Sequence, residues 1–414
     1  MDETDEPKTR FVNYNREPAS ERAKAFVADA VAKLLANETR QRKRRPRDQE
    51  NFHGQASALI CDLCHDTLTD GSGLHFRRSH RAYEALTRYD PNFLTKKVTD
   101  VVDMMIASEL AEQVMGQRNP FGTNVATLIR PTRTFIEALR RSGLSVADFA
   151  RGKGAETIIL REPKPDHWSR GKLADYQDDE TTNRYREEIR TINQWLAEAD
   201  LGFDHPLVSA NAVDVSDRHL SRIFTGSFDR CGRLYGGYWQ PLKKELRREG
   251  LRINGEPVAV LDFGQMIVRL AYGHAGARPP EGDAYCIEPY GPAYREGFKT
   301  LISAMLFNDK EPTKKPKGTK DLLPKGDVEA LCQAVKQAHP SISHLFGAGK
   351  GLSLMFQESE ILIEIIRELM AIGITALPIH DAIAVSIICH EQAIEIMRNT
   401  FRNKVGVEPI IKIE

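Results

Sequence analysis

Two short apolar segments, each containing an aspartate, constrain this chain more than any other feature of its sequence. In EPVAVLDFGQ, an apolar run leads into Asp262, and in LPIHDAIAV (377–385) a similar run surrounds Asp381. Apolar runs of this length are typical of buried strands, where a lone carboxylate is costly unless it has a partner. If tertiary folding brings the two aspartates together, they can bind a pair of divalent cations about 3.5–4 Å apart.

The segment YREGFKTLISAMLFND, which lies between the two aspartates, predicts a helix. Its residues Arg295, Lys299, Ser303 and Phe307 recur every four positions and therefore share one face. Two cations followed by a small and an aromatic side chain suit a triphosphate with a sugar or base above it. Paired carboxylates and such a helix indicate phosphoryl transfer. For either aspartate alone, the alternative is a structural acid paired with an arginine. For the helix alone, the alternative is a surface helix with unrelated charges.

Composition sets broader limits. The chain has 414 residues, 41% hydrophobic and 28% charged, which is typical of a folded protein with two or three domains. Basic and acidic residues balance at 58 each, so any nucleic-acid affinity must come from local patches. The six scattered cysteines favour a reducing, cytoplasmic setting over a disulfide framework. We expect no membrane partner, because no apolar stretch approaches the roughly 18–20 residues that span a bilayer.

The N-terminal half divides into three predicted segments. Residues 1–50 should hold a helix at 19–38 and a basic linker, RQRKRRPRDQ, that either contacts phosphates or is simply solvated. Residues 51–160 predict small helices, a helix from Leu94 that Gly116 stops, a hairpin, and a helix opened by Pro131. This order resembles a winged helix, which binds either DNA or proteins. Residues 161–204 predict a helical connector with its helix at 181–199.

A possible zinc site lies within the second segment. Cys61, Cys64, His75 and His80 form a C-x2-C and H-x4-H pattern that could bind tetrahedral zinc. The gap between the two pairs is shorter than in the usual zinc finger, and no apolar finger core lies between them. We therefore expect no zinc here.

Residues 205–414 resemble the family A DNA polymerases and, more distantly, the single-subunit RNA polymerases. DFGQMIVRLAYGH is similar to motif A (DYSQIELRxxAH), Arg295 with KTLISAMLFN to motif B (R-x3-K-x7-YG), and PIHDAIAV to motif C (VHDEIV). GSFDRCGRLYGGYWQPL resembles the TGRLSSxxxNLQNIP segment, which contacts primer and template in that family. The resemblance implies an α+β fold: a right-hand polymerase palm, with an antiparallel sheet and helices, and reduced fingers and thumb.

The resemblance also assigns roles to the residues of the metal and nucleotide sites. Asp262 and Asp381, with the carbonyl of Phe263, would bind two Mg²⁺ ions, for which Mn²⁺ could substitute. Arg295 and Lys299 would hold the triphosphate, and Lys299 would also be a candidate proton donor to the leaving pyrophosphate. Ser303 and Phe307 would complete the nucleotide site.

The same resemblance predicts nucleic-acid contacts. His380 would lie near the primer terminus, while Arg233 and Gln240 would follow the duplex. Glu358 precedes motif C, and its role stays open, with a charge near a helix N-terminus as the plainer interpretation.

Several departures from the family pattern leave the choice of sugar open. Ile267 stands where DNA-making members have the motif A glutamate that blocks a 2′-hydroxyl, and Phe307 and Asn308 replace Tyr-Gly. Ala382 replaces the second acid of motif C. Relaxed sugar selection and primase-like initiation therefore both stay open. The lysine- and proline-rich residues 308–327 predict a flexible loop.

The sequence thus predicts template-directed nucleotidyl transfer by residues 205–414. A primer-template of DNA and nucleoside triphosphates would be the partners, and RNA stays open as a further one. The alternatives are a non-catalytic replication initiator with a degenerate polymerase domain and a template-independent terminal transferase. The oligomeric state is not predicted.

Overall fold

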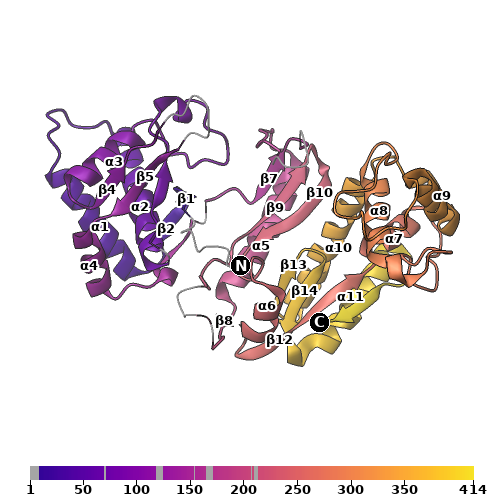
Figure 1. Ribbon diagram of the computed structural model, residues 1–414. Coiled ribbons are helices and arrows are strands. Elements are labelled where there is room, and N and C mark those ends of the chain that lie inside the picture. Colours follow the sequence, from indigo (N-terminus) through magenta and orange to yellow (C-terminus); the bar gives the residue numbers. More distant parts are fainter. Residues whose placement is uncertain are drawn as a thin grey trace. The chain divides into compact units, whose positions relative to one another are not determined.

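The computed structural model is a mixed α+β protein that divides into two compact units, as Figure 1 shows along the chain. It describes residues 9–69, 71–117, 125–152, 154–164, 171–206, 208 and 213–414. The N-terminal unit consists of Met1–Glu156 and His205–His219, and the C-terminal unit of Thr157–Asp204 and Leu220–Glu414. Among the described helices, none is both long and apolar enough to cross a membrane.

The N-terminal unit combines helices with two small sheets. Its helices are α1 (Glu21–Ala36), α2 (Pro46–Leu68), α3 (Val98–Ala107) and α4 (Arg133–Ser142), with short 3-10 turns at His80–Tyr83 and Val146–Asp148. Its strands are β1 (Arg10–Phe11), β2 (Arg16–Pro18), β3 (Leu74–Phe76), β4 (Ala111–Val114), β5 (Thr127–Pro131) and β6 (Phe149–Arg151). One sheet has the order β1-β3-β5-β4, and β2 pairs with β6. Side-chain caps begin two of the helices: Ser20 accepts from the Ala23 amide and Thr132 from the Phe135 amide.

Two sequence expectations for this unit need correction. The helix expected to continue to Gly116 ends at Ala107, and Glu109 then adopts a positive φ of 55° before strand β4. In place of small helices, the region after residue 51 begins inside the 23-residue helix α2. Strands β4 and β5 form the expected antiparallel hairpin, but residues 118–124 at its tip lie outside the described residues.

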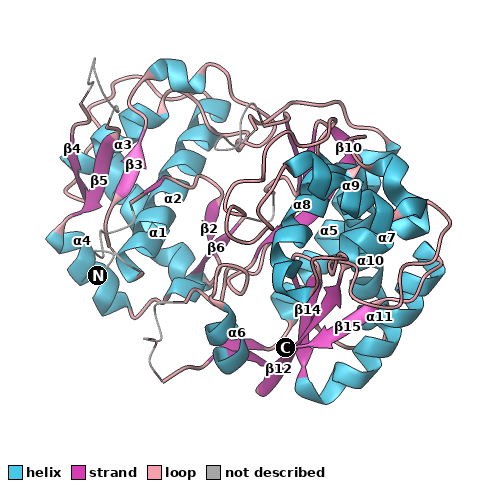
Figure 2. Ribbon diagram, turned by 45° about the vertical axis from the view of Figure 1, so that its right-hand side comes forward, coloured by secondary structure: helices cyan, strands magenta, loops and turns pink. Residues whose placement is uncertain are grey.

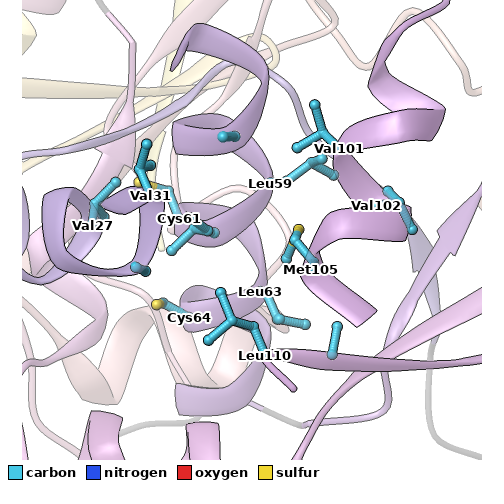
Figure 3. Packing of buried hydrophobic residues seen from close by; sticks show 14 of the residues in the cluster. Val27, Val31, Leu59, Cys61, Leu63, Cys64, Val101, Val102, Met105 and Leu110 are labelled. Carbon is cyan, nitrogen blue, oxygen red and sulfur yellow. The ribbon is translucent and has the colours of Figure 1, made fainter. Parts of the chain in front are cut away.

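The core of this unit surrounds the two cysteines that were considered as zinc ligands. Cys61 and Cys64 lie on α2 among side chains from α1 and α3 (Figure 3), and both thiols are fully buried. Burial raises the pKa of Cys61 to about 12. His75 bonds instead to Thr9 and His80 to Thr99, so hydrogen bonds in different places occupy the two imidazoles.

The C-terminal unit contains two further sheets. Its strands are β7 (Ile158–Arg161), β8 (Leu201–Phe203), β9 (Leu220–Thr225), β10 (Ser227–Gly236), β11 (Leu251–Ile253), β12 (Glu256–Gly264), β13 (Ala376–Ile379), β14 (Ala382–Ser386) and β15 (Ile410–Ile413). Its helices are α5 (Glu180–Glu198), α6 (Lys244–Gly250), α7 (Met266–His274), α8 (Arg295–Phe307), α9 (Val328–Ala338), α10 (Gly351–Ala371) and α11 (His390–Val405), with 3-10 turns at Pro292–Tyr294, Pro340–Leu345 and Ile387–Cys389. Residues 161–204, predicted as a connector, contribute α5, β8 and the end of β7 to this unit.

An antiparallel sheet forms the centre of the C-terminal unit. Its order is β13-β14-β12-β11-β8, and β15 pairs with β12 beside β11. Figure 2 shows β12, β14 and β15 side by side. The long helix α10 contacts β10, β13, α7 and α11. Strand β12 is therefore central in the sheet and pairs with other strands along both of its edges.

The segment 308–327 contains no helix or strand, as expected for a loop, yet it packs on α8. A Cβ atom added at Gly297 would lie 1.9 Å from the carbonyl oxygen of Leu322, so only glycine permits this approach. Leu323 is buried, and the Lys315 ammonium donates to the Pro324 carbonyl at 2.7 Å. The loop is thus anchored to the helix that carries the predicted nucleotide-binding residues.

Candidate functional site

The two aspartates singled out in the sequence lie side by side in the central sheet. Strand β12 pairs antiparallel with β14, and Asp262 is directly opposite Ala382, the residue that follows Asp381. His380 and Asp381 form the two-residue loop between β13 and β14, with His380 at a positive φ of 58°. A tight hairpin thus brings the Asp381 carboxylate to the end of β14, next to Asp262.

Neither aspartate has a hydrogen-bonded or ion-paired partner within the described residues. No hydrogen bond or salt bridge there involves Asp262 or Asp381, and both side chains are half-buried. Burial, followed by the negative charge of Asp381, raises the pKa of Asp262 from 3.8 to about 6. Two adjacent carboxylates that repel each other form a site that a cation would stabilise.

The two carboxylates would need further ligands to hold metal ions. Across the described ranges, no group of three or more His, Cys, Asp or Glu side chains is placed to bind a metal. Magnesium usually takes one or two carboxylates and completes its shell with water, carbonyl and phosphate oxygens. The pairing of β12 with β14 ends at Asp262, so no residue of β14 lies opposite Phe263 and the Phe263 carbonyl remains a candidate ligand. The Phe263 ring packs on Phe401. The donor set fits Mg²⁺ and does not resemble a structural zinc site.

Helix α8 presents the predicted stripe to one side of this site. Lys299 and Phe307 are exposed, Arg295 and Ser303 are half-buried, and the intervening residues Phe298, Leu301, Ile302 and Met305 form the buried face. The Lys299 ammonium lowers the pKa of Asp262, which places the lysine within electrostatic range of that carboxylate.

Arg295 is held in place by its neighbours. Its Nε atom donates to Asp283 at 2.6 Å, a second nitrogen contacts Glu296, and the guanidinium lies 5.3 Å from the Tyr285 ring centroid. These contacts leave about a quarter of the side chain exposed, at 27%. Arg295 is thus oriented before any anion arrives.

A buried ion pair, which the sequence did not reveal, lies within electrostatic range of the two aspartates. Glu358 is only 1% exposed, and its carboxylate accepts two hydrogen bonds from Arg233, at 2.6 and 2.9 Å. Burial raises the pKa of Glu358 to about 7, the Arg233 hydrogen bonds oppose that shift, and the charges of Asp381 and Asp262 add to it. Glu358 is the eighth residue of α10, so it is not a helix N-terminal charge.

The remaining predicted residues occupy the surroundings of the hairpin. Gln240 donates to the backbone carbonyls of Leu234 and Pro378 and accepts from the Gly236 amide, so it ties β10 to β13. The exposed His380 ring lies 6.0 Å from the Tyr235 ring, edge to face. Ile267 is half-buried in the first turn of α7.

The signal for Glu358 was present in the sequence. Residues Leu354, Glu358, Ile361 and Ile365 follow the helical period and are all buried, so an acid occupies a position on an apolar stripe. An acid in that position requires a cationic partner. Its identity as Arg233, on a strand distant in sequence, depends on tertiary structure.

Comparison with known proteins adds little to this geometry. No protein-family model matches the chain, and no curated protein matches it. Among solved structures, it is similar to the POL domain of Pol1 from M. smegmatis in complex with DNA primer-template and dNTP. The identity is 12% and the TM-score 0.33, with 56% of this chain aligned to 50% of that chain. At that TM-score the likeness carries no argument, so the case for function depends on the site.

Proposed function

We propose that the C-terminal unit is a nucleotidyltransferase that extends a nucleic-acid strand from nucleoside triphosphates with two magnesium ions. The observation that carries the proposal is that Asp262 on β12 and Asp381 in the adjoining β13–β14 loop lie next to each other without a hydrogen bond or salt bridge, with Lys299 of α8 near enough to lower the pKa of Asp262. The order of the four motif-like segments supports a compact relative of the family A DNA polymerases. A structural acid would instead be expected to have an arginine or a set of amide donors.

The chemistry requires a hydroxyl to attack the α-phosphorus while the bond to the bridging oxygen of pyrophosphate breaks. When bound, the metal would favour loss of the hydroxyl proton and offset charge on the phosphoryl oxygens. Asp262 and Asp381 would bind the metal, with the Phe263 carbonyl as a further ligand. Arg295 and Lys299 would hold the β- and γ-phosphates, and Lys299 would donate a proton to the departing pyrophosphate.

The nucleotide and the duplex would contact opposite sides of this centre. Ser303 and Phe307 continue the α8 stripe beyond Lys299 and would lie along the sugar and base. His380 would approach the primer terminus. Arg233 would face the duplex while Glu358 fixes its orientation, and Gln240 would position the motif C hairpin in addition to its predicted role along the duplex.

Sugar selection would be relaxed, because Ile267 cannot form the polar barrier that the motif A glutamate provides in DNA-making relatives. The variant Ile267→Glu is expected to lower the use of ribonucleotides relative to deoxyribonucleotides. The two nucleotide sets, compared on one primer-template, measure this ratio. An unchanged ratio would remove Ile267 from the proposal.

The test of the main proposal is extension of a labelled primer-template by the full chain with Mg²⁺ or Mn²⁺ and either nucleotide set. We expect extension by the native protein, none by Asp381→Ala, and native activity for Asp321→Ala, which removes an exposed loop carboxylate. Extension that survives Asp381→Ala, or no extension under any condition, would contradict the proposal. Omitting the primer tests primase-like initiation, and omitting the template tests the terminal-transferase alternative.

A non-catalytic replication initiator makes the opposite prediction. Such a protein would bind DNA without incorporating nucleotides, and Asp381→Ala would leave its DNA affinity unchanged.

A further inference from the structure

Strand β15 adds a lysine that the sequence motifs do not contain. In the register of β15 with β12, Lys412 is directly opposite Asp262. Residues directly opposite in an antiparallel pair project from the same face of the sheet. Lys412 therefore emerges beside the Asp262 carboxylate, on the edge of β12 away from Asp381.

The course of the side chain gives a second, independent observation. A Cβ atom added at Gly264 would lie 3.3 Å from Cε of Lys412, so the lysine stem extends over Gly264. Gly264 is two residues beyond Asp262 on the same face and two residues before the start of helix α7. The stem thus runs across the sheet toward α7, rather than outward from the edge strand.

The ammonium of Lys412 also acts on the carboxylate that orients Arg295. Its positive charge lowers the pKa of Asp283, the carboxylate that orients Arg295. Within the described residues, no salt bridge includes Lys412. An ammonium that emerges beside Asp262 and has no salt-bridge partner there is available to the triphosphate that the proposed metal site would hold.

We propose that Lys412 is a third phosphate-binding cation of the nucleotide site, acting with Arg295 and Lys299. The inference depends on the proposed function and identifies a recognition group for the triphosphate moiety. A lysine compensates for negative charge without the directional demands of an arginine, so it can follow the phosphates as they separate. The alternative is a solvated lysine that only protects an edge strand from pairing with another chain.

The test compares the full-length native protein with Lys412→Met, which keeps the stem over Gly264, and with Lys412→Arg, which keeps the charge. Lys404→Met is the matched control, because Lys404 pairs with Glu364 on α10. Equilibrium binding of dATP, dAMP and inorganic tripolyphosphate is measured in Mg²⁺, alongside KM and kcat for primer extension.

We expect Lys412→Met to weaken binding of dATP and tripolyphosphate about tenfold, a loss of one charge-assisted contact, and to change dAMP binding much less. KM for the nucleotide should rise more than kcat falls, and Lys412→Arg should restore most of the affinity. Equal affinity of Lys412→Met and the native protein, or an equal loss in Lys404→Met, would overturn the assignment.

The outcomes also separate this inference from the proposed function. Triphosphate binding that depends on Lys412 without any extension would support the lysine site and contradict nucleotidyl transfer. Primer extension that is the same in Lys412→Met and in the native protein would contradict the lysine site alone. Absence of both binding and extension would contradict both.

Discussion

The two units bury aspartates in opposite ways. In the N-terminal unit, Asp62 has a fully buried side chain that accepts two hydrogen bonds from Arg10 at 2.8 Å, one from Arg16 and one from the Asn13 amide. In the C-terminal unit, Asp262 and Asp381 are half-buried side by side and have neither a hydrogen bond nor a salt bridge within the described residues. Donors within hydrogen-bonding distance compensate the charge of Asp62, whereas Asp262 and Asp381 have no such donors within the described residues.

Charge compensation distinguishes a structural acid from one that is free to bind a ligand. A carboxylate surrounded by donors fixes local structure, because its charge is already compensated. A pair of uncompensated carboxylates costs stability, and such a cost is typical of binding and catalytic sites. Four substitutions test the comparison, in order of decreasing expected effect.

The largest effect is expected at Asp62. Asp62→Ala leaves the Arg10 and Arg16 guanidinium groups without their shared acceptor, so we expect the N-terminal unit to lose about 3–5 kcal/mol of unfolding free energy. Urea denaturation followed by circular dichroism measures this, with Asp29→Ala on the exposed face of α1 as the control. A loss below about 1 kcal/mol would mean that Asp62 does not stabilise the fold as the shared acceptor of Arg10 and Arg16.

The second substitution breaks the Glu358 pair. Arg233→Met should cost about 2–4 kcal/mol at pH 8, because it leaves a buried carboxylate unpaired. The pKa of Glu358 in the folded protein, about 7, lies above its ordinary value of 4.5, so ionisation destabilises the fold as pH rises through this window. Removal of Arg233, which lowers the pKa of Glu358, raises that pKa further, so the variant loses more stability than the native protein as Glu358 ionises, and the cost should be smaller at pH 6 than at pH 8. Denaturation at both pH values tests the sign, and the double variant Arg233→Met/Glu358→Leu should recover most of the loss.

The third substitution should stabilise the protein. The folded pKa of Asp262, about 6, exceeds its ordinary value of 3.8, so its ionisation destabilises the fold fully above pH 6 and not at all below about pH 4. Asp262→Asn should therefore add about 1–2 kcal/mol at pH 8 without divalent metal. The gain should vanish near pH 4. Loss of stability at pH 8 would place Asp262 in the same structural class as Asp62.

The smallest effect is expected at Asp283. Asp283→Asn removes the charged partner of Arg295 Nε but leaves the guanidinium over Tyr285, so nucleotide binding should weaken by only about threefold. Nucleotide KM in the extension assay measures this change. A loss as great as that of Arg295→Ala would show that Asp283 does more than orient the arginine.

Helical periodicity in the sequence predicted two helices with nearly correct bounds. The helices expected at 19–38 and 181–199 lie at Glu21–Ala36 and Glu180–Glu198, where side-chain caps from Ser20 and Asp179 mark the starts. The four-residue repeat from Arg295 also gave the accessible face of α8 correctly. These features depend on residue spacing and cap residues, both of which can be identified in the sequence itself.

Features that depend on pairing between distant segments were harder to predict from the sequence. The helix expected to continue to Gly116 ends early, because Ala111–Val114 pairs with β5 and tertiary hydrogen bonding outweighs helical periodicity. Asp262 and Asp381 were linked through their motifs, but their adjacency follows from the β12–β14 register. The Arg233–Glu358 pair and the position of Lys412 depend on contacts between distant segments, for which one sequence contains no direct signal.

The most direct test of a divalent-metal site at Asp262 and Asp381 is Mn²⁺ binding, measured by electron paramagnetic resonance. The measurement compares the native protein with Asp262→Asn, Asp381→Asn and the exposed control Asp321→Asn. We predict that each active-site variant weakens Mn²⁺ binding at least about tenfold at pH 7.5, while the control binds as the native protein does. Native affinity should also fall as pH drops below about 6, where the Asp262 carboxylate takes up a proton. Native-like Mn²⁺ affinity in both Asp262→Asn and Asp381→Asn would contradict the assignment of these aspartates as a divalent-metal site.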